Sequence, residues 1–86
     1  MALIFIDVDP DTGNDHSPTV WVDPDTGDVV AQGWEADSAL LVDVAANPAP
    51  NHVPGVPAGE AVIRIPARMV PALRKACDAA EALAVR

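Results

Sequence analysis

Two stretches of the chain repeat the sequence Asp-Pro-Asp-Thr-Gly, at residues 9–13 and 23–27. Alternating Asp residues with a nearby Gly are typical of loops that bind calcium through oxygen atoms. Calcium requires about six to eight oxygen ligands, and the helical form of such a loop ends on a bidentate Glu. At the corresponding positions this chain has Val20 and Trp34. We therefore expect two similar turns, with weak calcium or small-ligand binding as the alternative.

Other residue types that carry out chemistry are sparse. His16 and His52 lie far apart in predicted loops, with no Cys or His at metal-ligand spacing. Ser17 and Ser38 are not part of a nucleophile motif, and no glycine-rich phosphate loop occurs. Cys77 is the only cysteine, which excludes an internal disulfide, and we expect it to be a small buried apolar residue. The sequence thus predicts no enzyme activity, no metal site and no cofactor.

Charge is distributed unevenly along the chain, whose formal net charge is −8. The first 63 residues contain eleven Asp or Glu side chains and no Lys or Arg. All five Lys and Arg residues follow, from Arg64 onwards. A surface of this kind does not suit a phosphate backbone, and it would be steered towards a basic protein surface. Solubility alone is the simpler explanation of the acidity.

Aromatic residues are few, and Trp is enriched at protein interfaces. Trp21 and Trp34 are therefore candidate anchors, and a place in the core is the alternative. Arg68 belongs to a basic patch that is either a solvated helix face or a contact for the acidic part of a partner. The predicted partner-binding residues are Asp9, Asp11, Asp23, Asp25, Asp28, Trp21, Trp34 and Arg68.

These residues are expected on a small sheet. Residues 2–8 read as a strand with apolar side chains on both faces, buried on both sides or at a subunit contact. Residues 9–18 read as a loop. Residues 19–23 and 29–34 then form a hairpin around the turn 23–28, where Gly27 supplies a positive φ. This hairpin could make Trp21 and Trp34 cross-strand neighbours.

The second half of the chain predicts two helices and one more strand. Asp37 or Ser38 caps a helix that ends at Asn47, and an exposed Pro-rich loop follows at 47–59. Residues 61–65 read as a strand. A turn over 67–70 precedes an amphipathic helix from Pro71 to the C-terminus. Its predicted apolar face is Met69, Val70, Leu73, Ala76, Cys77, Ala80, Leu83 and Ala84.

The expected fold is therefore α+β, in the order β-β-β-α-β-α. It is a small, mainly antiparallel sheet with the helices packed on one side, the long C-terminal one among them, in a single domain over 1–86. The chain lacks the basic start of a signal peptide and has no apolar run long enough to span a bilayer. We therefore expect a cytoplasmic protein without membrane contact.

Two segments carry a resemblance to a known group of proteins. These are Pro18-Thr19-Val20-Trp21-Val22-Asp23-Pro24-Asp25-Thr26-Gly27-Asp28 with Gln32-Gly33-Trp34, and Glu60-Ala61-Val62-Ile63-Arg64-Ile65-Pro66-Ala67-Arg68-Met69-Val70. Over residues 3–80 the chain resembles small actinobacterial proteins of streptomycete type. These proteins have no characterised function and are often encoded beside helix-turn-helix transcription regulators.

The resemblance implies a regulatory accessory protein that binds such a regulator and tunes its DNA binding. A homodimer that makes no direct nucleic-acid contact is the expected form. The alternatives are a cation- or small-ligand-binding domain and an oligomeric structural protein, for instance a phage-derived scaffold.

Overall fold

The computed structural model describes residues 2–11, 13 and 17–84 of the chain. Contacts between residues group the chain into two compact units. The first unit comprises Met1–Gly33 and Ile65–Arg86, and the second comprises Trp34–Arg64. The sequence predicts a single domain over 1–86. In the structure the middle third of the chain, Trp34–Arg64, forms a separate group of internal contacts.

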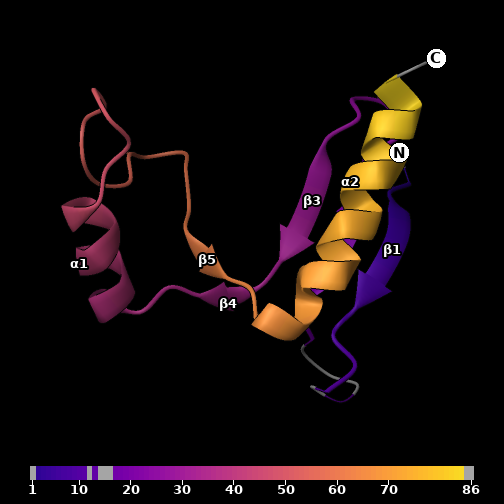
Figure 1. The fold of residues 1–86 in the computed structure, drawn as a ribbon, viewed down its shortest axis with the longest axis horizontal. Helices are drawn as coiled ribbons and strands as arrows, with labels where there is room; N and C mark the ends of the chain where they lie inside the picture. Colours follow the sequence, from indigo (N-terminus) through magenta and orange to yellow (C-terminus); the bar gives the residue numbers. More distant parts are fainter. Residues whose placement is uncertain (1, 12, 14–16, 85–86) are drawn as a thin grey trace. The chain divides into compact units, whose positions relative to one another are not determined.

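The first unit contains a three-stranded antiparallel sheet in the order β1-β2-β3. Its strands are β1 (Ile4–Val8), β2 (Thr19–Val22) and β3 (Val29–Gln32). Figure 1 shows its two outer strands, β1 and β3, on either side of the long C-terminal helix. The predicted hairpin is confirmed, with Val22 opposite Val29. Its turn is closed by the Asp23 N–H, which donates to the Asp28 carbonyl at 2.9 Å, and Gly27 has φ +78°. The α+β class and the packed C-terminal helix are confirmed as well.

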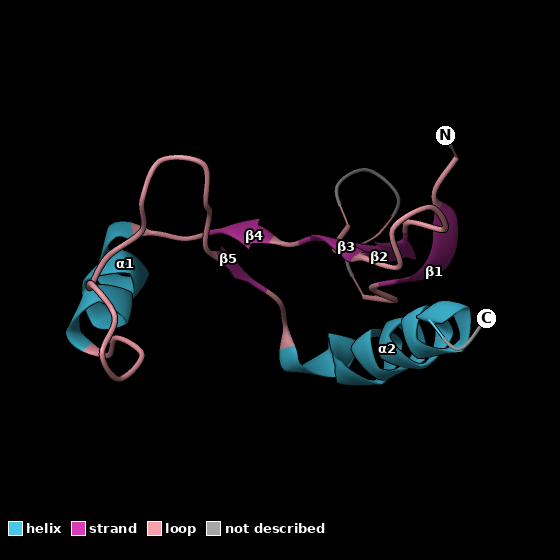
Figure 2. Ribbon diagram, turned by 90° about the horizontal axis from the view of Figure 1, so that it is seen from above, coloured by secondary structure: helices cyan, strands magenta, loops and turns pink. Residues whose placement is uncertain are grey.

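A long helix covers one side of this sheet (Figure 2). A single 3₁₀ turn, η1 (Ala67–Met69), leads into α2 (Val70–Ala84). Pro71 is the second residue of α2. Its lack of an N–H costs no helical hydrogen bond, because the N–H groups of the first turn have no acceptor within the helix. The buried core joins two strand residues to three residues of η1 and α2: Val20, Val22, Met69, Ala72 and Ala76.

The face that α2 buries differs from the predicted one at two positions. Val70 and Cys77 are exposed, so the prediction of a buried thiol is wrong. Ala72 and Ala79 take part in the packing instead. The packed positions recur every three to four residues from Met69, so the face that meets the sheet is turned towards Ala72 and away from Cys77.

Burial of β1 on both sides, one of the two expectations for this strand, is wrong within a single chain, and the other, a subunit contact, stays a prediction. Leu3, Ile4, Phe5 and Val8 are exposed, because β1 is an edge strand and only one face of the sheet has a helix on it. The register against β2 shifts between Phe5 and Asp7. This bulge leaves Ile6 packed against the core.

The second unit contains α1 (Ser38–Ala46) and a short two-stranded sheet of β4 (Trp34–Glu35) and β5 (Ile63–Arg64). The N-cap prediction is confirmed, since the Leu40 N–H donates to the Asp37 carboxylate at 2.8 Å. The predicted strand 29–34 is interrupted at Gly33, and the strand near 61–65 pairs with β4 rather than with the main sheet. The helix α1 has no buried residue and belongs to this second unit, whereas α2 packs on the main sheet within the first unit.

The Pro-rich segment 47–59 is exposed throughout, as predicted. No helix within the described part of the chain has the length and apolar character needed to cross a membrane.

Candidate functional site

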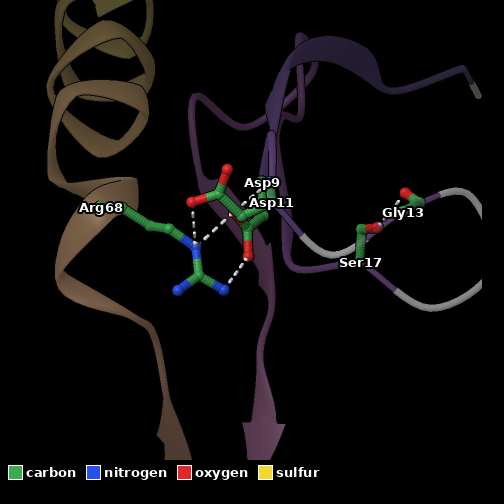
Figure 3. Close-up of polar contacts among 5 residues, drawn as sticks. All are labelled: Asp9, Asp11, Gly13, Ser17 and Arg68. Atoms are coloured by element: carbon green, nitrogen blue, oxygen red, sulfur yellow. Dashed lines mark hydrogen bonds and ion pairs between the residues drawn. The ribbon is translucent and has the colours of Figure 1, made fainter.

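The first Asp-rich loop is held against the start of the C-terminal helix by one ion pair (Figure 3). Arg68 Nε donates to Asp9 Oδ1 and Arg68 Nη2 donates to Asp9 Oδ2, both at 2.7 Å. The Asp9 residue is 2% exposed, so its carboxylate is neutralised inside the protein. These hydrogen bonds to Asp9 raise the pKa of the Arg68 guanidinium above its ordinary value. Asp11 lies further away, with its Oδ2 3.6 Å from Arg68 Nε.

The two Asp-Pro-Asp-Thr-Gly stretches share one local geometry. The Asp11 N–H donates to Asp9 Oδ1 at 3.0 Å, and the Asp25 N–H donates to Asp23 Oδ1 at 2.9 Å. Both are Asx turns, which an Asp side chain forms with the backbone two residues on. The predicted similarity is confirmed for this Asx turn, and among the described residues an arginine lies on the first carboxylate and not on the second.

The five predicted Asp residues do not form one surface. The loop after β1 carries Asp9 and Asp11, whereas the turn after β2 carries the other three. Since β1 and β2 are antiparallel, these two connections lie at opposite ends of the sheet. Asp25 and Asp28 are exposed, and among the described residues neither side chain has an ion pair or hydrogen bond.

A second ion pair was not anticipated from the sequence. Lys75 Nζ lies 3.1 Å from Asp7 Oδ2, joining α2 to the edge strand β1. The pKa of Asp7 is lowered, first by the Val8 N–H that donates to it at 2.9 Å and then by Lys75. No local sequence signal points to this pair, because 68 positions separate Asp7 from Lys75.

The two tryptophans lie in different sheets, so the expectation of cross-strand neighbours is wrong. Trp21 in β2 is directly opposite Phe5 and Val30. Trp34 in β4 is opposite Arg64. The hairpin register separates them, because it pairs Trp21 with Val30 and position 34 lies beyond the last pair of the ladder, Thr19 with Gln32.

Among the described residues, no three His, Cys, Asp or Glu side chains lie close enough to hold a metal ion. His16, one of the two histidines considered for zinc, lies outside the described residues, as do Asn14 and Asp15 of the first repeat. One open hollow is lined by residues 53–57, a stretch without an ionisable side chain. It therefore offers no group for acid–base or nucleophilic chemistry.

No protein-family model, curated protein or solved structure matches the chain.

Proposed function

We propose that this chain is a non-enzymatic regulatory module that binds a basic surface of a helix-turn-helix DNA-binding protein. It acts as a homodimer in the cytoplasm and contacts the protein rather than the nucleic acid. The observation that carries the proposal is the unequal neutralisation of the two Asp-rich turns. Arg68 neutralises Asp9, whereas the hairpin turn presents Asp25 and Asp28 without a basic partner from the described chain.

The hairpin turn is suited to such contact because it is rigid as well as charged. Its backbone is closed by the Gly27 N–H, which donates to the Asp23 carbonyl at 2.8 Å, and by the Asp23–Asp28 bond. Side chains held on a fixed turn lose little conformational freedom when a partner binds. Carboxylates arranged in this way attract a Lys- or Arg-rich surface over about 8–10 Å at physiological salt.

The test is complex formation with the helix-turn-helix protein encoded nearest to this chain's gene. Binding is measured by size-exclusion chromatography and by calorimetry at micromolar concentrations. The decisive variant reverses two charges, Asp25→Lys with Asp28→Lys. Within the described part of the chain neither side chain makes a hydrogen bond or ion pair, so the variant is expected to fold normally and to bind at least about tenfold more weakly.

The matched control is Asp78→Lys with Glu81→Lys, which makes the same change in net charge on the exposed side of α2. This control is expected to bind within a few-fold of the unaltered chain. Raised salt should weaken binding by the unaltered chain and have a smaller effect on the hairpin-turn variant. Equal losses in both double variants would refute a role for the turn, and no complex at all would refute the proposed function.

A further inference from the structure

The backbone of β3 presents hydrogen-bonding groups on the side away from β2. The Asp23 N–H donates to the Asp28 carbonyl, so these two residues form a hydrogen-bonded pair at the turn end of the hairpin. Along an antiparallel ladder, hydrogen-bonded pairs alternate with pairs that are not hydrogen-bonded. Val29 and Ala31 therefore belong to the pairs without hydrogen bonds. Their N–H and C=O groups point outward, away from β2.

No strand of the described chain takes up these outward groups. The strand β3 is at the end of the three-stranded sheet, and β2 is its only neighbour among the described strands. Within the same part of the chain, neither Val29 nor Ala31 has a backbone hydrogen bond to a turn or loop. Both residues are exposed. Donors and acceptors arranged in this way are the groups with which a sheet edge binds an additional strand.

The two edges of this sheet differ in their protection against such pairing. Proteins block an exposed edge with a bulge, a charged side chain or a proline. The edge strand β1 has a bulge between Phe5 and Asp7, and Asp7 is charged and paired with Lys75. The strand β3, Val29–Gln32, contains no charged residue and no proline, and its register against β2 is regular. It is therefore the edge that can accept another strand.

Acidic side chains lie at the beginning of this edge. Asp28 directly precedes Val29, and Asp25 lies in the same turn. Both are exposed, and neither has an ion pair within the described chain. Side chains directly opposite each other on neighbouring strands have their Cβ atoms about 4.5–5.5 Å apart, close enough for opposite charges to pair. The edge thus suits an extended segment with neutral side chains opposite β3 and a Lys or Arg opposite Asp28.

We infer that β3 binds an extended segment of the basic partner, which adds to the sheet as a further antiparallel strand with a Lys or Arg beside Asp28. A helix does not fit this edge, because its backbone groups are already bonded along the helix. A second copy fits less well, because each chain has a net charge of −8. The inference rests on the proposed function for the identity of the partner, and it states how that partner is held beside the same acidic turn.

The test uses a synthetic peptide, acetyl-Lys-Thr-Val-Thr-Val-Thr-Lys-amide, titrated into the full chain and followed by the backbone amide signals in NMR spectra. The variant is Ala31→Pro, which removes an outward N–H and leaves the hydrogen bonds to β2 in place. The control is Ala31→Thr, which keeps that N–H. We expect the control to bind within a few-fold of the unaltered chain and Ala31→Pro to bind at least about tenfold more weakly. The same peptide with N-methylated central residues keeps its charge and should not bind.

Hydrogen exchange gives a second measurement that does not depend on the fold of Ala31→Pro, which circular dichroism verifies. In the isolated chain the amides of Val29 and Ala31 should exchange faster than those of Val30 and Gln32, which face β2. Saturating peptide should slow the first two at least about tenfold. Slow exchange at Val29 and Ala31 without peptide, the result expected if a second copy pairs with β3, would overturn the inference. Equal binding by the two Ala31 variants, or no binding of the peptide, would overturn it as well.

Failure of this inference is distinguishable from failure of the proposed function. A helix-turn-helix protein that binds both Ala31 variants equally would uphold the proposed function and refute strand addition at β3. Binding of the peptide at β3 without any complex with that protein would uphold strand addition and refute the proposed partner.

Discussion

Replacement of Asp9 by Ala tests how the first Asp-rich loop is held to α2. The change removes two hydrogen bonds to Arg68 and the acceptor for the Asp11 N–H. A hydrogen bond to a charged group contributes about 1.5–3 kcal/mol, and one from a backbone N–H to a solvent-exposed carboxylate about 1 kcal/mol, because water screens it. Two effects offset part of this loss. Burying Ala costs less free energy than burying a carboxylate, and the Arg68 side chain, which is 37% exposed, can hydrogen-bond to water instead. We expect unfolding to become easier by about 2–4 kcal/mol.

The chain contains its own control for this measurement. Asp23→Ala removes the same Asx hydrogen bond in the second repeat, where no arginine is bound. Its expected cost is about 1 kcal/mol, against a total stability of about 4–13 kcal/mol for a chain of this length. Both values come from urea denaturation followed by circular dichroism, with equal m-values as the check on the unfolded state. Equal costs for the two variants would show that the Asp9–Arg68 pair contributes nothing, and the reasoning would fail.

Further predictions concern the core, the edge strand and the hairpin turn. Met69→Ala should cost about 2–5 kcal/mol in the same assay because it leaves a cavity under the sheet, whereas the exposed neighbour in Val70→Ala should cost less than about 1 kcal/mol. The lowered pKa of Asp7 means that this carboxylate stabilises the fold above its unfolded-state pKa and stops doing so as pH falls through the folded-state value. Stability measured from pH 6 down to about pH 2 should therefore fall less steeply in Asp7→Asn, and an unchanged slope would contradict this. Gly27→Ala should cost about 1–2 kcal/mol from its positive φ alone, since no atom lies within 4 Å of the added Cβ, and a neutral or stabilising effect in the thermal melt would contradict it.

Sequence reasoning was accurate where the signal is local. The hairpin turn, the Asp37 cap, the end of α1 at Asn47 and the exposed loop 47–59 each depend on residues a few positions apart. Sequence reasoning failed where the burial of a side chain depends on which other element packs against it. Apolar residues on both faces of β1 indicate burial in general, and the chain supplies a helix for one face only.

The candidate site shows the same division. The acidic residues and tryptophans were evident from composition, but their grouping was not. The repeat at 9–13 and 23–27 looks equivalent in sequence, yet the antiparallel connection of β1 and β2 sends its two copies to opposite ends of the sheet. The register of the hairpin, which pairs Trp21 with Val30, separated two tryptophans that had been expected to be cross-strand neighbours.

By itself the sequence determined the α+β class, the turn chemistry of both Asp-Pro-Asp-Thr-Gly stretches and a strongly acidic surface, because backbone preferences and charge counts belong to the residues themselves. Only the tertiary structure decided that Asp9 pairs with Arg68, 59 positions away, while Asp25 and Asp28 stay exposed. It likewise decided that Phe5 and Trp21 lie opposite each other on neighbouring strands. Such pairings depend on strand order and on where α2 lies, and these result from packing the whole chain at once.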